Sequence, residues 1–261
     1  MRLDKFLSES SIGRRKEVRI FIKDGKVKVN SEIVIIPAYE IDEENDRIEY
    51  LDEDVEHNGK MYYMFHKPFG CITARKDSKH QTVMDYFECE DTKGLFPVGR
   101  LDKDTEGLLF LTNDGEFNHQ LMYPDQHVKK TYYFWAFGTL DDEQINKLEN
   151  GIVIRDGEPL TKPAKIEILK TGLFRDLQHE LKDIHYEKIK INPQEQSVLE
   201  GHITISEGRK HQVRRMLKAA GCYVVYLKRI SIGEIILDET LQKGQYREMT
   251  REEVTRLKNG G

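Results

Sequence analysis

Cysteine and long apolar runs are scarce in this sequence. Its 261 residues include only three cysteines, Cys71, Cys89 and Cys222. They are too few and too scattered for a disulfide framework or a Cys-x-x-Cys metal site, which favours a reducing compartment. No run of about 18 apolar residues occurs, so we expect no membrane-spanning helix and no membrane partner. The opening Met-Arg-Leu-Asp-Lys-Phe-Leu lacks the apolar core of a signal peptide, which predicts a cytoplasmic protein.

Motifs that hold cofactors are also missing. The sequence contains no glycine-rich phosphate-binding loop, no dinucleotide-binding fingerprint and no Cys/His zinc spacing. We therefore expect a function that uses no cofactor and no metal ion. Hydrophobic residues make up 38% and charged residues 33% of the chain, which is typical of a soluble globular protein. Its length leaves room for two domains.

Charge is unevenly distributed along the chain. The net charge of −5 argues weakly against a nucleic-acid partner. However, residues 1–30 hold nine Lys/Arg against four Asp/Glu, and residues 207–229 hold seven against one. Between these segments, residues 40–56 hold ten Asp/Glu and a single Arg. Two basic segments separated by an acidic one predict two surfaces that face a polyanion.

The first 50 residues predict a small module of two short helices followed by strands. Val18, Phe21 and Ile22 fall on one helical face, and basic residues occupy the other positions of that helix. Gly25 is placed to end the helix, and residues 26–29 then alternate between lysine and valine, as in a half-buried strand. Residues 52–60 are polar and aperiodic, and they precede a new apolar strand. We expect the module to span residues 1–52 and a linker to span residues 53–60.

This module resembles the S4 RNA-binding domain. The resemblance lies in Arg2–Leu7, Gly13–Glu17 and Ile22–Asn30, with Asn30-Ser31 where the family has Asn-Gly. It implies that the second helix and its adjoining loop face structured RNA, chiefly through phosphates. The basic residues of the module expected to bind RNA are Arg2, Lys5, Arg14, Arg15, Lys16, Arg19 and Lys26.

Residues 61–257 predict a larger domain in which strands predominate. Lys130–Phe137 is rich in β-branched and aromatic residues, and alternation places Tyr132 and Phe134 on one face of that strand. Cys71–Ala74 reads as a short strand, Gly208–Ala220 as a helix, and residues 171–198 as an insertion between two strands. The fold class expected is α+β with a mixed, mainly antiparallel sheet.

Residues 98–112 form the most informative segment. Gly99-Arg100 interrupts the apolar pattern and puts a cation close to Asp102, and Leu108–Leu111 then reads as a buried strand. A charged turn that feeds a core strand places Asp102 at the wall of a cleft, where a catalytic carboxylate is expected. The alternative is a surface turn with an Arg–Asp pair.

Motifs in this domain resemble those of the ribosomal RNA pseudouridine synthases of the RsuA/RluB/RluE/RluF group. They occur in family order as Lys67–Gly70, Gly99–Leu109, Lys130–Tyr132, Glu207–Met216, and Leu227–Arg229 with Gly244–Arg247. Leu160–Ala164 looks most like the branch that acts on 16S rRNA of the small subunit. The resemblance implies an enzyme that isomerises uridine to pseudouridine, a reaction that needs a carboxylate at the sugar but no redox partner.

The resemblance also implies a role for each motif residue. Asp102 attacks C1′ or removes a C2′ proton, and the sequence does not choose between the two. Arg214 is the ion-pair partner expected to keep Asp102 charged, and Tyr132 stacks on the uracil. Leu101 and Leu227 belong to the substrate pocket, and Arg100 fills the gap left in the RNA when the nucleotide swings out. Arg209, Lys210 and His211 open a helix that suits phosphate, and the remaining RNA contacts expected in this domain are Lys67 and Arg215.

Other interpretations stay open at this point. Tyr132 can be a plain core aromatic, and Arg214 can be one more phosphate contact. The chain can be a 23S rRNA synthase of the same group or a non-catalytic RNA-binding or ribosome-assembly factor. A glycosidase that uses Asp102 and Asp104 is a further alternative, although it would need no basic module. The partner expected is ribosomal RNA, alone or in a partly assembled subunit, bound by a monomer.

Overall fold

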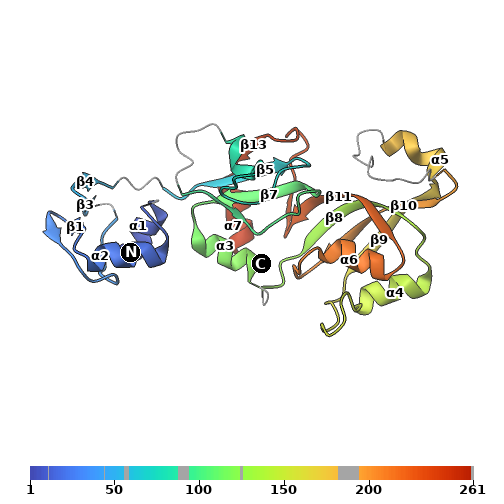
Figure 1. Ribbon diagram of the computed structural model, residues 1–261, viewed down its shortest axis with the longest axis horizontal. Helices are drawn as coiled ribbons and strands as arrows, with labels where there is room; N and C mark the ends of the chain where they lie inside the picture. Colours follow the sequence, from blue (N-terminus) through green and yellow to red (C-terminus); the bar gives the residue numbers. More distant parts are fainter. Residues whose placement is uncertain are drawn as a thin grey trace.

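The computed structural model describes residues 1–10, 12–43, 45–55, 59–87, 94–123, 126–181 and 194–259. Figure 1 shows a small N-terminal module at one end of an elongated molecule. Its elements are α1 (Leu3–Glu9), α2 (Arg15–Lys23), β1 (Val27–Val29), β2 (Glu32–Ile33), β3 (Ile48–Tyr50) and β4 (Glu53–Asp54). The strands form a sheet in the order β2-β1-β3-β4. Leu3, Leu7, Val18, Ile22 and Val27 are fully buried in a core of its own.

The module is longer than the sequence predicted. Asp54 pairs with Glu49 and Glu53 pairs with Tyr50, so β4 extends the sheet by one strand. Val55 then packs against the core of the module. The linker expected at residues 53–60 therefore begins after Val55, and residues 56–58 lie outside the described part of the chain. An exposed edge strand is as polar as a linker, so composition could not separate the two.

The larger domain is built on one mixed sheet. In the described residues it has nine strands, with the order β13-β5-β7-β11-β8-β10-β9 and with β6 and β12 paired at the side. The strands are β5 (Tyr62–Lys67), β6 (Phe96–Val98), β7 (Glu106–Thr112), β8 (Lys130–Phe137), β9 (Lys165–Leu173), β10 (Ser197–Ile205), β11 (Tyr223–Ile232), β12 (Ile235–Ile236) and β13 (Tyr246–Glu248). Between these described strands only β7 and β11 pair in parallel, which confirms the mixed, mainly antiparallel fold.

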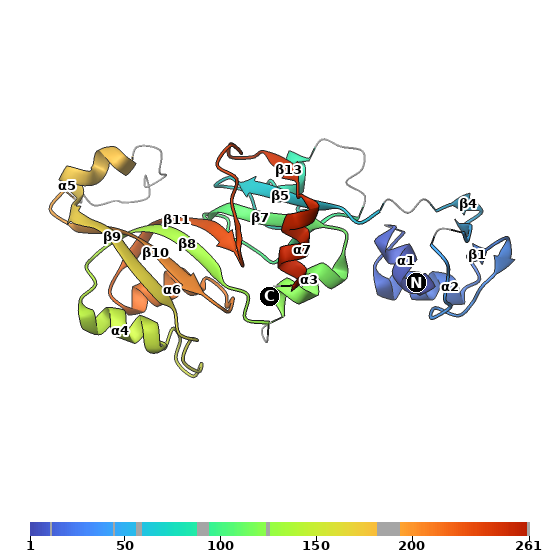
Figure 2. The ribbon, with the colours of Figure 1, turned by 180° about the vertical axis from the view of Figure 1, so that it is seen from behind.

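Helices cover the sheet on both faces. They are α3 (Gly115–Met122), α4 (Asp142–Asn150), α5 (Phe174–Leu177), α6 (Gln212–Ala219) and α7 (Arg251–Asn259), with 3-10 turns η1 (Val83–Tyr86) and η4 (Gln178–Leu181). Figures 1 and 2 show α3 and α7 beside β5 and β7. Helix α4 packs against β9, and α6 packs against β11. Strand β7 is buried throughout, with Leu109 and Leu111 in one core cluster and Leu108 and Phe110 in another. No helix in the described ranges has the length and apolarity needed to cross a bilayer.

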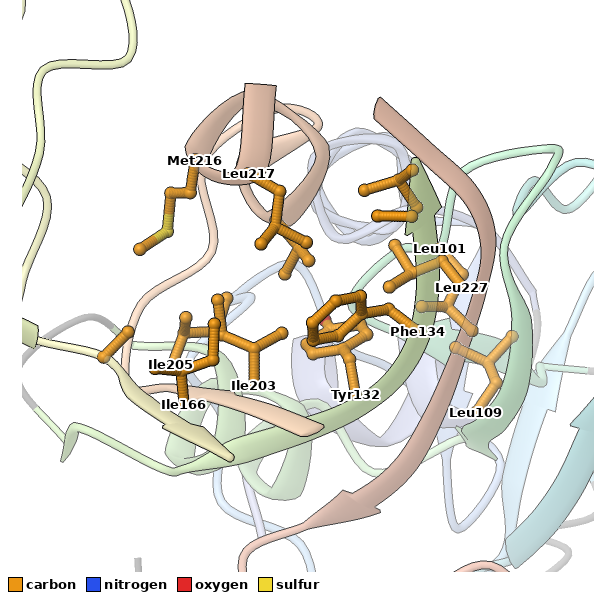
Figure 3. Close-up of a cluster of buried hydrophobic side chains, with 14 of the residues drawn as sticks. Leu101, Leu109, Tyr132, Phe134, Ile166, Ile203, Ile205, Met216, Leu217 and Leu227 are labelled. Carbon is orange, nitrogen blue, oxygen red and sulfur yellow. The ribbon is translucent and has the colours of Figure 1, made fainter. Parts of the chain in front are cut away.

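The two faces of β8 enter different cores. Tyr132 and Phe134 pack with Met216 and Leu217 of α6 in the main cluster (Figure 3). Trp135 contributes to a separate cluster on the opposite side of the strand, which also includes Phe137 and Phe174. Alternation along β8 therefore predicted the face of Tyr132 correctly.

Three local expectations are corrected by the structure. Ile72 makes a single bridge with Thr82, so residues 71–74 do not form a strand. Strand β9 continues to Leu173, and the excursion between β9 and β10 is limited to residues 174–196, of which 182–193 lie outside the described residues. Helix α6 begins at Gln212, four residues later than expected, because His211 has a left-handed backbone with φ 52°.

Candidate active site

A cavity of about 790 Å³ lies where the loop before β7 meets β8, β11 and the start of α6. It brings together residues from motifs that are more than 100 positions apart in the sequence. The predicted site residues that line it are Arg100, Leu101, Asp102, Tyr132, Arg209, Lys210, His211, Arg214 and Leu227. The cavity is therefore the candidate active site.

The loop that carries Asp102 is held on both sides of the carboxylate. The Thr73 hydroxyl donates to the Leu101 carbonyl (2.7 Å) and accepts from the Leu101 amide (3.1 Å). The Thr105 amide donates to the carbonyl of Asp102 at 3.1 Å. The Asp102 side chain remains 30% exposed, so a fixed backbone presents a carboxylate that a substrate can reach.

Lys67 supports this loop from inside the protein. Its side chain is fully buried, and its ammonium group donates to the carbonyls of Thr105 (2.9 Å) and Pro68 (3.0 Å). Burial lowers the pKa of Lys67. The predicted RNA contact is therefore wrong for Lys67, because its ammonium group has no access to a phosphate. It ties the first motif of the domain to the segment that carries Asp102.

Arg214 is paired with Asp104 rather than with Asp102. Its guanidinium group lies 3.2 Å from the Asp104 carboxylate and donates to the Asp104 carbonyl at 2.9 Å and the Val224 carbonyl at 3.2 Å. No ion pair joins Arg214 to Asp102 within the described ranges. The predicted ion pair between Arg214 and Asp102 is therefore wrong. Asp104 offers the Arg214 guanidinium group both a carboxylate and a backbone carbonyl. Arg214 thus fastens α6 and β11 to the loop of Asp102.

His211 is the side chain that faces the Asp102 carboxylate. Its Nε2 atom lies 3.4 Å from an Asp102 carboxylate oxygen, and its side chain is half exposed. The left-handed backbone of His211 ends the loop, so Arg209, Lys210 and His211 precede α6 instead of opening it. Strained backbone of this kind costs about 1–3 kcal/mol and is typical of functional sites. Lys210 is exposed beside His211 and remains a candidate phosphate contact.

Arg209 and Arg215 are used to hold the protein together. The guanidinium group of Arg209 donates to the carbonyls of Pro159 and Leu160, each at 2.7 Å. That of Arg215 donates to the Ile154 carbonyl at 3.1 Å. Both side chains are about three-quarters covered. The RNA contacts predicted for these two residues disagree with this placement, because their donors already have protein acceptors.

Tyr132 is both a core residue and a wall of the cavity. Its side chain is 8% exposed and packs with Leu101 and Leu227 in the main cluster (Figure 3). The two interpretations left open by the sequence are therefore compatible. An aromatic ring fixed by apolar neighbours on one side offers a rigid stacking surface on the other.

Sequence reasoning missed two cations of the cavity. Lys130 and Arg229 both line it and are almost completely buried. Strand alternation could have identified both cations, because residues two apart on a strand lie on the same face. Lys130 lies two residues before Tyr132, and Arg229 lies two residues after Leu227.

The N-terminal module carries its own cluster of arginines. The fully buried carboxylate of Asp4 lies 2.8 Å from Arg19, 3.0 Å from Arg2 and 3.5 Å from Arg15. Burial acts to raise the pKa of Asp4, but hydrogen bonds from Arg19 and Arg2 outweigh it and hold that pKa below its ordinary value. One buried anion thus orders three arginines, whereas Arg14 and Lys16 are simply exposed. Lys26 lies over the Phe21 ring, and Lys5 lies near Glu9 and Glu116.

Gly107 is required where the two halves of the sheet join. It has φ 104°, and a Cβ atom there would lie 2.2 Å from the Arg229 carbonyl oxygen. We expect Gly107→Ala to lower the free energy of unfolding by at least about 2 kcal/mol, from backbone strain and from loss of the β7–β11 pairing. Gly157→Ala is the matched control, because Gly157 has φ 78° with nothing within 4 Å. Equal losses in denaturant titrations of the two variants would contradict a role for the contact with Arg229.

The basic module and the carboxylate-bearing cavity define an RNA-directed enzyme with a separate RNA-binding domain. The S4 domain model matches residues 1–48, and the RNA pseudouridylate synthase model matches residues 61–219. The chain belongs to the RNA pseudouridylate synthase family, and its catalytic class is that of a pseudouridine synthase.

Relatives match nearly the whole chain. The uncharacterized RNA pseudouridine synthase YtzG of Bacillus subtilis is 40% identical, with 97% of each chain covered. Ribosomal small subunit pseudouridine synthase A of Haemophilus influenzae is 35% identical over 98% of this chain and 99% of its own. Ribosomal large subunit pseudouridine synthase B of Bacillus subtilis is also 35% identical, over 98% and 95%. A crystal structure of a pseudouridylate synthase matches with a TM-score of 0.65 and 34% identity, and 98% and 99% of the two chains are covered.

Proposed function

We propose that this enzyme converts one uridine of 16S ribosomal RNA to pseudouridine, with Asp102 as the catalytic carboxylate. The observation that carries the proposal is the position of Asp102, held on a fixed loop in a cavity that it shares with Tyr132 and Leu227. Relatives named for the small ribosomal subunit support 16S rRNA as the substrate. The segment at Leu160–Ala164 that resembles this branch is fastened beside the cavity by Arg209.

The cavity fits the chemistry of uridine isomerisation. The N1–C1′ bond must break, the uracil must turn, and C5 must join C1′. Asp102 serves at the sugar, by attack on C1′ or by removal of a C2′ proton. Tyr132 offers its ring to the uracil, Leu101 and Leu227 give the apolar wall, and the exposed Arg100 at the cavity edge takes the place of the flipped nucleotide in the RNA.

A reaction of the purified enzyme with separate 16S and 23S rRNA tests the substrate. We expect pseudouridine at one position of 16S rRNA, in the free RNA or in a partly assembled small subunit. The second candidate is a 23S rRNA synthase, which the large-subunit relative favours at the same 35% identity. Product in 23S rRNA alone would favour that candidate, and RNA binding without product in either RNA would favour a ribosome-assembly factor.

The S4 domain is proposed to bind rRNA through phosphates. A chain that begins at residue 59 retains the large sheet and both of its main cores. We expect it to bind rRNA more weakly, since residues 1–30 carry five more positive than negative charges. Each lost phosphate contact reduces the slope of log affinity against log salt by about 0.7–0.9. Activity of the shortened chain should recover in part at high RNA concentration.

The control for this deletion is the full chain with Lys16→Gln and Arg14→Gln, which removes two exposed cations of the module. Its affinity and salt slope should fall between those of the full chain and the shortened chain. Unchanged affinity and salt slope after the deletion would contradict the proposed role. A monomeric state and a cytoplasmic location are further parts of the proposal.

A further inference from the structure

Lys130 and Arg229 are two buried cations without a carboxylate partner among the residues that the structure describes. Their exposed fractions are 7% and 2%, and none of the ion pairs in the described ranges includes either residue. The Lys130 ammonium group donates to the Val128 carbonyl at 3.0 Å, and Nε of Arg229 donates to the Leu108 carbonyl at 2.8 Å. Nη2 of Arg229 is buried and has no hydrogen-bond partner in the described part of the chain. Two positive charges therefore lie close together in the wall of the cavity that holds Asp102.

Such an arrangement is costly for the folded protein. Buried charges are ordinarily paired, because removal of a charge from water costs several kcal/mol that only a partner offsets. This electrostatic cost affects Lys130, because burial and the nearby Arg229 lower the pKa of Lys130 to about 8. Both residues line the cavity that holds Asp102, so an anion that enters this cavity would be the missing partner.

The two cations flank Tyr132 on its own face of the sheet. Arg229 is the cross-strand neighbour of Tyr132, and Lys130 precedes Tyr132 by two residues on β8. Cross-strand neighbours of this kind have Cβ atoms about 4.5–5.5 Å apart. A ring stacked on Tyr132 therefore has both cations at its edge.

We propose that Lys130 and Arg229 form an oxyanion subsite that stabilises the uracil ring while it is detached from the ribose. The inference rests on the proposed function of the cavity. When the N1–C1′ bond breaks, its electron pair leaves with the uracil, and the charge spreads from N1 to O2 and O4. C1′ is compensated by a bond to Asp102 or by loss of the C2′ proton to Asp102. C5 then forms the new bond to C1′ while the Asp102–C1′ bond breaks, or while Asp102 returns the proton to C2′. The C5 proton is lost and N1 is protonated, so Asp102 is regenerated and the isomerisation balances without a co-reactant.

A charge that appears only during the reaction explains why the cations are unpaired in the free enzyme. Fixed donors aimed at a developing anion act mainly on the chemical step. A phosphate of the RNA would be the other source of an oxyanion, and it would act on affinity instead. The depth of the two cations beside Tyr132 favours the uracil.

Lys130→Met is the decisive variant, and Lys129→Met is its matched control, because Lys129 is exposed on the neighbouring position. For Lys130→Met we expect the single-turnover rate of pseudouridine formation to fall about 10²-fold, the scale of one lost oxyanion donor. The Kd for RNA and its salt slope should stay as in the unmodified enzyme. An equal fall in rate and affinity, with a slope reduced by about 0.7–0.9, would assign the subsite to a phosphate and overturn the proposal.

Stability gives a second readout that a structural lysine would not share. The pKa of Lys130 is lower in the folded chain than in the unfolded chain, so the unfolded state binds more protons between about pH 8 and the ordinary lysine value. Wild-type stability should rise with pH through this window. Lys130→Met should therefore raise the Tm at pH 7 by several degrees, and this gain should shrink towards pH 10. A lower Tm with an unchanged rate would show a purely structural residue.

A ligand assay separates this inference from the identity of the RNA. 5-Nitrouracil is an acidic uracil that is an anion at neutral pH. We expect the full-length enzyme to bind it more tightly than neutral uracil, and Lys130→Met to lose about tenfold or more of that preference. Equal binding of both bases would overturn the subsite even if rRNA is modified. Absence of product in rRNA together with a clear preference for the anion would instead contradict the proposed substrate.

Discussion

Replacement of Asp102 by asparagine is expected to abolish pseudouridine formation. The amide keeps the shape of the side chain and its place on the loop that Thr73 and Thr105 hold, but it can neither attack C1′ nor accept a proton. Loss of a nucleophile or general base costs about 10⁴-fold or more in rate. Single-turnover assays with rRNA and purified Asp102→Asn measure this loss.

Binding provides the control for this variant. Asp102 lies in the cavity, away from the arginine cluster of the S4 domain, so the Kd of Asp102→Asn for rRNA should stay within about twofold of wild type. Asp104→Asn removes a neighbouring carboxylate of the same loop and should retain measurable turnover. Comparable turnover by wild type and Asp102→Asn would refute the assignment of Asp102.

Replacement of Arg214 by leucine is the second large effect expected. Arg214 connects α6 and β11 to Asp104, two residues from Asp102, through three contacts of 2.9–3.2 Å. Without them the loop of Asp102 loses an anchor, and misplacement by about 1 Å costs about 10²-fold in rate. We expect kcat to fall by this amount, with little change in the Kd for rRNA.

Two further variants test whether Arg214 acts by position. Arg214→Lys should recover only part of the rate, because an ammonium group cannot reproduce the planar fork that reaches Asp104 and Val224 together. Asp104→Asn should show a smaller loss than Arg214→Leu, since the Asp104 carbonyl contact survives. A decrease in affinity as large as the decrease in kcat would identify Arg214 as a phosphate contact and contradict this role.

Most of the architecture and the composition of the cavity could be predicted from the sequence. Strand period placed Tyr132 and Phe134 on one face, and the apolar run Leu108–Leu111 identified a strand buried on both sides. Asp102, Tyr132 and Arg214 were predicted to share a site, and they line one cavity. These features depend on the local residue pattern and on the order of motifs, and both can be read from one sequence.

The roles of individual cations were harder to predict. Lys67, Arg209 and Arg215 are basic residues in RNA-enzyme motifs, yet their donors serve backbone carbonyls of distant segments. Whether a lysine or arginine faces solvent or such a carbonyl depends on the tertiary path of the chain, which composition does not encode. In the same way, the conformation of the loop decides whether Arg214 pairs with Asp104 or with Asp102, which lies only two positions away.

The central claim is tested most directly by a site-resolved pseudouridine map of the rRNA from cells that lack this protein. Cells supplied with the wild-type chain or with Asp102→Asn complete the comparison. We expect one pseudouridine of 16S rRNA to disappear in the deletion, to return with the wild-type chain and not to return with Asp102→Asn, although the variant protein accumulates and binds rRNA. A 16S rRNA map that is identical in all three strains would contradict it.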